Sequence, residues 1–103
     1  MNSIHRLTIE VKKIRGKCPV FKVGDKIVIE GPEIVPEKTD ALCIHALGSM
    51  LSIVIALGRG VCFKELGLAK EEGDVGYVHC LDPGPPYTLG GTVTFEIRRE
   101  KMT

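Results

Sequence analysis

Tryptophan and glutamine are absent from this chain of 103 residues, and asparagine occurs once, at Asn2. Three Phe and two Tyr are the only aromatic residues, too few to suggest platforms on which nucleobases stack. The 14 Lys and Arg are balanced by 13 Asp and Glu and are scattered along the chain, so nothing favours binding to nucleic acid. Scarce amides beside plentiful Lys, Glu, Ile and Val are typical of thermophile proteins.

The usual cofactor sequences are missing as well. No GxGxxG, Walker or HExxH motif occurs, and the four cysteines contain no CxxC pair. The amino-terminal stretch MNSIHRLTIEV alternates polar and apolar residues, unlike the apolar segment of a signal peptide. We therefore expect a cytoplasmic protein with reduced thiols, although hyperthermophiles do form intracellular disulfides and four cysteines allow three pairings.

An uninterrupted run of uncharged residues, Ala41–Leu57, lies within the segment Asp40–Arg59 and predicts a buried helix. At 100° per residue its apolar side chains cover more than half of the helix surface. The narrow stripe that remains consists of polar or small residues and includes His45 near its amino-terminal end. The stretch is shorter than a membrane span of about 20 apolar residues, so we expect no membrane contact. One sheet cannot cover so wide an apolar surface, which predicts a homo-oligomer, a dimer or trimer, through the 40–59 helix.

Alternating apolar residues predict four strands, at His5–Ile14, Ile27–Glu30, Val75–Leu81 and Thr92–Arg98. The second strand should run antiparallel to the first, because only a short turned segment separates them. With the helix between the two pairs, the order is ββαββ. We expect an α+β fold in which one long buried helix packs on one face of an antiparallel sheet. At this length, residues 1–103 should form a single domain.

Local signals place the ends of the helix. Thr39 or Asp40 is the expected N-cap, because side chains of these types accept the first free N–H groups of a helix. The sequence Gly58-Arg59-Gly60 is typical of a helix end, and Phe63–Leu68 suggests one further helical turn.

Three cysteines can meet at one end of such a sheet. Cys18 precedes a turn, Cys43 opens the helix and Cys80 ends a strand, so their thiolates with His45 form a candidate site for zinc or another thiophilic metal. Inside a helix, Cys43 and His45 would point about 200° apart and bind one ion only if the helix starts after the cysteine. Core packing is the alternative for Cys43, and a third reading is a nucleophilic or redox thiolate stabilised by the helix amino terminus. Core packing also accounts for Cys62.

Two further segments carry candidate residues. Asp25 follows a glycine in a turn, where aspartate usually binds the local backbone, with a catalytic acid or base as the alternative. The connector Asp82–Gly91 is too rich in proline for a helix or strand, and its glycines free N–H groups that can cradle an anion. Its candidate ligand-binding residues are Asp82, Gly84, Tyr87, Gly90 and Gly91. The alternative is a rigid link between strands. His79 and Cys80, being neighbours on a strand, should face opposite sides of the sheet.

Five motifs span nearly the whole chain: Gly16–Pro19, Gly24–Asp25, Leu42–Leu47, Cys80–Gly84 and Gly90–Phe95. Together they resemble a family of small uncharacterised prokaryotic proteins with the pattern GxCP, GD, CxHAL, CxDPG and GGTVxF. The resemblance implies three thiols and a histidine as candidate functional groups and carries no activity. Three hypotheses follow: a metal- or small-ligand-binding protein, a cysteine-dependent enzyme or redox protein, and an assembly subunit with structural cysteines. In the second hypothesis the candidate catalytic residues are Cys43 as nucleophile or redox thiol and Asp25 or His45 as acid or base.

Overall fold

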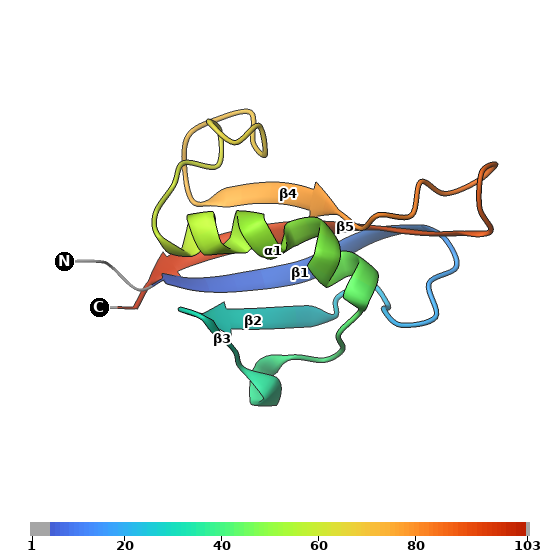
Figure 1. Ribbon diagram of the computed structural model, residues 1–103, viewed down its shortest axis with the longest axis horizontal. Coiled ribbons are helices and arrows are strands. Elements are labelled where there is room, and N and C mark those ends of the chain that lie inside the picture. Colours follow the sequence, from blue (N-terminus) through green and yellow to red (C-terminus); the bar gives the residue numbers. More distant parts are fainter. Residues whose placement is uncertain (1–4, 103) are drawn as a thin grey trace.

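In the part of the chain that the structure describes, five antiparallel strands form one sheet, and a single α-helix crosses one of its faces (Figure 1). The strands of this computed structural model are β1 (His5–Gly16), β2 (Lys26–Glu30), β3 (Glu33–Ile34), β4 (Val75–His79) and β5 (Gly90–Lys101), in the spatial order β3-β2-β1-β5-β4. The structure describes residues 5–102, so the first four residues of the alternating amino terminus and the last residue of the expected domain lie outside it.

The α+β class, the antiparallel sheet and the single helix are confirmed, whereas the order ββαββ is wrong by one strand. The segment Gly31–Pro32, which follows the second expected strand, turns the chain back so that Ile29 pairs with Ile34. The resulting two-residue β3 is followed by a 3-10 turn, η1 (Pro36–Lys38). A strand this short shows no alternation, which is why the sequence pattern does not reveal it.

Two long strands form the centre of the sheet. β1 and β5 pair from His5 opposite Lys101 to Gly16 opposite Gly90, with register shifts at Val11/Lys13 and Arg15/Gly16. Both run beyond their expected ends because backbone pairing continues after the apolar alternation stops. β1 and β5 extend beyond the helix, and the connector from β4 joins β5 at that end of the sheet (Figure 1).

The helix α1 (Ile44–Gly58) starts four residues later than expected, and Cys43 is its N-cap. Thr39 and Asp40 do not cap it, because their side chains bind the backbone of β2 instead. Thr39 Oγ1 accepts the Val28 N–H at 3.1 Å, and an Asp40 carboxylate oxygen accepts the Lys26 N–H at 2.9 Å. The expected helical turn at 63–68 is a series of hydrogen-bonded turns rather than a helix.

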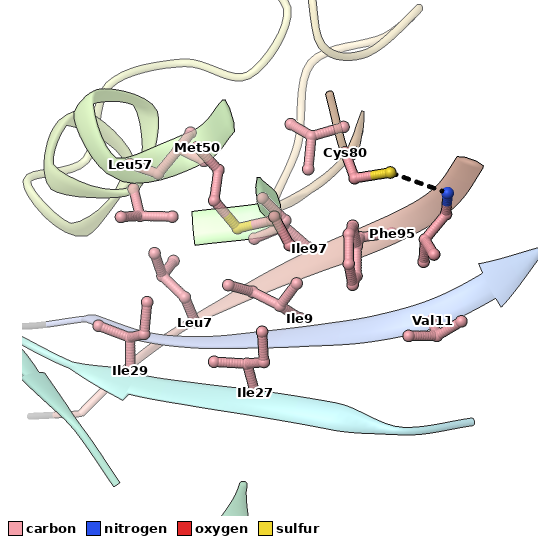
Figure 2. Close-up of a cluster of buried hydrophobic side chains, with 14 of the residues drawn as sticks. Leu7, Ile9, Val11, Ile27, Ile29, Met50, Leu57, Cys80, Phe95 and Ile97 are labelled. Atoms are coloured by element: carbon pink, nitrogen blue, oxygen red, sulfur yellow. Dashed lines mark hydrogen bonds between the residues drawn. The ribbon is translucent and has the colours of Figure 1, made fainter. Parts of the chain in front are cut away.

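One face of α1 packs on the sheet and the other does not. The buried side chains of the helix are Ala46, Met50, Val54 and Leu57. Figure 2 shows Met50 and Leu57 above the sheet residues Leu7, Ile9, Ile27 and Ile97, which are also buried. On the opposite side, Ile44, Leu51 and Ile55 are 82%, 53% and 67% exposed. The helix is therefore buried on one side only, whereas the sequence predicted a buried helix. Within residues 5–102, no helix has the length and apolar character needed to cross a membrane.

Candidate functional site

A pocket of about 330 Å³ opens at the amino-terminal end of α1. Three thiols line it, those of Cys18, Cys43 and Cys80, together with His45 and Asp82. Its remaining walls are mostly apolar and come from Pro19, Val20, Phe21, Ile44, Ala46 and Val93, with Gly90 and Gly91 at the base of β5. Residues from four separate parts of the chain therefore meet here, including all four sequence candidates for the metal site.

Three glycines bring Cys18 to the pocket. The segment that follows β1 crosses the start of β5 so closely that a Cβ on Gly91 would lie 2.8 Å from the Lys17 carbonyl oxygen and 3.5 Å from the Cys18 Cα. Gly16, Gly90 and Gly91 all have positive φ, between 80° and 114°. Side chains are disfavoured in that conformation, so glycine is required here for both steric and conformational reasons.

Cys18 is half-buried, and its sulfur faces a backbone donor. The Phe21 N–H lies 3.3 Å from the Cys18 Sγ, within the turn that the cysteine begins. Phe21 itself is buried and packs edge-on against Phe95, with ring centroids 5.4 Å apart, which anchors the turn to the core.

Cys80 is a different kind of thiol, because its hydrogen bonds are already made. It is only 5% exposed; its Sγ accepts the Val93 N–H at 3.2 Å (Figure 2) and donates to the Gly91 carbonyl at 3.3 Å. The donated bond requires the protonated form. Cys80 thus ties the end of β4 to β5 and forms the floor of the pocket as a thiol.

Cys43 and His45 lie at the first turn of α1. Cys43 has an extended backbone, φ −129° and ψ 130°, and makes no side-chain cap hydrogen bond. Its carbonyl accepts the Leu47 N–H at 2.9 Å, so the helix starts immediately after it. The first N–H groups of a helix have no partner within the helix, and they favour negative charge nearby. Because Cys43 precedes the helix proper, both side chains can line one pocket, with Cys43 half-buried and His45 exposed.

Asp82 stands at the pocket edge and organises the connector. One carboxylate oxygen accepts hydrogen bonds from the Thr88 hydroxyl and, at 2.8 Å, from the Gly84 N–H. The Thr88 bond is the main reason that the pKa of Asp82 is lowered, the Gly84 N–H adds to it, and the positive charge of nearby His45 contributes further. Asp82 is therefore an anion at neutral pH.

Two of the connector's N–H groups that could cradle an anion are bound within the chain. Asp82, Gly90 and Gly91 line the pocket, but the Gly84 N–H is bound by Asp82 and the Gly90 N–H donates to Thr88 Oγ1 at 3.1 Å. Gly84 and Tyr87 lie outside the pocket lining, and Tyr87 is 82% exposed. Thr88 was not among the residues that the sequence pattern indicated. Its position six residues after Asp82 gives no local signal, since the contact depends on how the prolines fold the loop.

Asp25 lies outside the thiol pocket. Its carboxylate accepts the Lys22 N–H at 3.0 Å, its own carbonyl accepts the Val11 N–H at 2.8 Å, and it is 8% exposed. These bonds fit the structural role that the turn chemistry predicts. His79 and Cys80 do face opposite sides of the sheet, and Cys62 is half-buried outside the pocket.

A ready metal site is not present among the described residues. Within 5–102, no group of three or more His, Cys, Asp or Glu side chains is arranged to hold a metal ion. The candidate ligands share the pocket, but a metal would have to draw them together.

Comparison with known proteins adds no functional assignment. The chain matches no protein-family model, no curated protein and no solved structure. The chemistry of the pocket is therefore the basis for a functional assignment.

Proposed function

We propose that the protein binds a small, largely apolar ligand in the pocket at the start of α1, with the Cys18 and Cys43 thiols as its chemically specific contacts. The supporting observation is that thiols from three distant segments line one mostly apolar pocket of about 330 Å³. That size is at the lower end of the range for small-molecule sites, which combine apolar walls with a few polar groups. The Cys18 sulfur accepts the Phe21 N–H, and Cys43 stands at the amino terminus of α1, so backbone N–H groups lie beside both cysteines.

A thiophilic metal ion such as zinc is the other ligand of this site that the donor types support. Cys18, Cys43 and His45 would supply soft and borderline ligands, with Cys80 held back by its bond to the Gly91 carbonyl. Metal binding on this proposal requires the three side chains to approach one another. A small organic ligand fits the arrangement as it stands, which is why it is preferred.

Native mass spectrometry of the untagged protein, together with zinc titration, tests the proposal. We expect the wild-type protein to retain a small molecule or to bind one zinc ion per chain. The amount bound should fall at least tenfold in the Cys18→Ser and Cys43→Ser variants. Cys62→Ser is the matched control, since Cys62 is half-buried but lies outside the pocket lining. Equal loss in the control, or no ligand and no zinc binding in the wild-type protein, rejects the proposal.

The position of Cys43 also favours a second candidate, a cysteine-dependent enzyme or redox protein. A thiolate at a helix amino terminus is stabilised and is therefore more available as a nucleophile. Iodoacetamide provides the test, because the thiolate displaces iodide and becomes carboxamidomethylated. Cys43 should react several times faster than Cys62 at neutral pH. Equal rates would leave the binding proposal intact and remove the enzymatic one.

A further inference from the structure

The outer side of α1 carries a continuous apolar seam. Ile44, Gly48, Leu51 and Ile55 are spaced four, three and four residues apart, the spacing of side chains along a coiled-coil contact line. Turning 100° per residue places this seam opposite the buried Ala46, Met50 and Leu57. A Cβ built on Gly48 would meet no atom within 4 Å, so the surface beside Leu51 has room for a side chain from outside.

Charge is confined to the two ends of this segment. No charged residue lies between Asp40 and Arg59, and both of these residues are exposed. Asp40 precedes the helix, and its carboxylate accepts the Lys26 N–H of β2, so the seam itself carries no charge. Two copies packed antiparallel would place the positive end of each helix dipole near the negative end of the other, whereas a parallel pair would bring like ends together. The helix dipoles thus favour a second copy packed in the antiparallel direction.

The side chains along the seam also match in size when two copies pack antiparallel. In an antiparallel pair centred between Gly48 and Leu51, each Leu51 meets the Gly48 of the other copy, and each Ile44 meets an Ile55. The Leu51 side chain of each copy therefore faces the open surface over Gly48 of the other copy. A two-fold interface requires this relation, since residue i must contact j while j contacts i.

We propose that the partner of this surface is a second copy of the chain, packed antiparallel through α1 about a two-fold axis between Gly48 and Leu51. The pairing has a consequence for the thiol pocket. Ile44 is both part of the pocket wall and 82% exposed, so Ile55 of the second copy covers the outer side of that wall. Each copy then shields the pocket of the other from solvent.

Sedimentation equilibrium at micromolar concentration is the first test. The wild-type chain should sediment at twice its mass of 11.2 kDa, and Leu51→Lys should sediment as a monomer with unchanged far-ultraviolet circular dichroism. Leu89→Lys is the matched control, because Leu89 is 99% exposed on the connector, away from the seam, and should remain dimeric. A monomeric wild-type chain overturns the proposal, whatever the pocket binds.

Mixing two charged variants tests the direction of packing. An antiparallel dimer places position 44 against position 55, so Ile44→Lys mixed with Ile55→Glu should form heterodimers above the half expected for random pairing, as counted by native mass spectrometry. A parallel dimer places position 44 against position 44, so there a mixture of Ile44→Lys with Ile44→Glu should be the more enriched pair, whereas an antiparallel dimer should pair that second mixture nearly at random. Random pairing of the first mixture, stronger enrichment of the second, or a trimer in either test contradicts the antiparallel arrangement.

Discussion

Gly16 and Gly90 approach each other so closely that a Cβ added to Gly16 would lie 2.6 Å from the Gly90 Cα, and the reverse distance would be 2.7 Å. Neither residue can carry a side chain without moving the backbone of the other. The contact is the point at which the end of β1 crosses the start of β5. Because Cys18 follows on one side and Gly91 on the other, this crossing determines the shape of the pocket floor.

A Gly90→Ala substitution should therefore weaken both stability and the pocket. The positive φ of 114° alone costs about 1–3 kcal/mol for a residue with a side chain, and the steric clash adds to it. Chemical denaturation measures the loss. Gly58→Ala is the control: Gly58 is helical, a Cβ there meets nothing within 4 Å, and alanine favours the helix by up to about 1 kcal/mol. Equal stability of the two variants would contradict the role assigned to the crossing.

Cys80 should be the slowest cysteine to alkylate in the folded protein. Its sulfur is buried and bound to both the Val93 N–H and the Gly91 carbonyl, whereas the other three thiols are half-buried. Peptide mapping after a short iodoacetamide pulse measures the order. Cys80→Ala should also destabilise by about 1–3 kcal/mol, because the Val93 N–H loses its partner. Rapid labelling of Cys80 under native conditions would show that the floor of the pocket opens.

Arg99 should contribute far more to stability than its neighbour Arg98. The Arg99 guanidinium donates to the Leu57 carbonyl at 3.1 Å and the Val61 carbonyl at 2.6 Å, and lies 4.9 Å from the centre of the Phe63 ring. Arg99→Ala leaves the end of α1 without these partners and should cost about 1.5–3 kcal/mol.

Arg98→Ala is the matched control for this prediction. Arg98 forms an ion pair with Glu96, and its side chain is 59% exposed. Surface pairs of this kind contribute up to about 1 kcal/mol. Thermal unfolding of the two variants decides, and similar melting temperatures would contradict the difference expected between the two arginines.

The connector should lose stability in acid. The pKa of Asp82 is lowered chiefly by the hydrogen bond from the Thr88 hydroxyl, so the ionised carboxylate is more stable in the folded protein than in the unfolded chain. Such a group contributes stability above its unfolded pKa, and the contribution is lost as pH falls through the folded value. Carboxyl NMR titration should place Asp82 below its ordinary range, and Thr88→Val should raise its pKa. An unchanged titration in that variant would show that Thr88 is not the cause.

Local patterns predicted the fold class for a clear physical reason. Apolar side chains at every second position, as in β1, and at helical spacing, as in α1, can each be buried on one side only as a strand or a helix. The ends of the elements were less accurate. Thr39 and Asp40 are good N-cap residues, yet their oxygens bind the N–H groups of β2, a partner that the local sequence does not contain.

The sequence by itself determined which chemical groups this protein has, that one helix would lie between strands of an antiparallel sheet, and that Cys80 and His79 would face opposite sides of the sheet. Only the tertiary structure decided that Cys18, Cys43 and Cys80 share one pocket, because the pairing of β1 with β5 and the glycine crossing bring distant segments together. It also distinguished the thiols from one another. Cys80 is bound to Val93 and Gly91, and those partners are set by the register of the folded backbone rather than by the residues next to it in the chain.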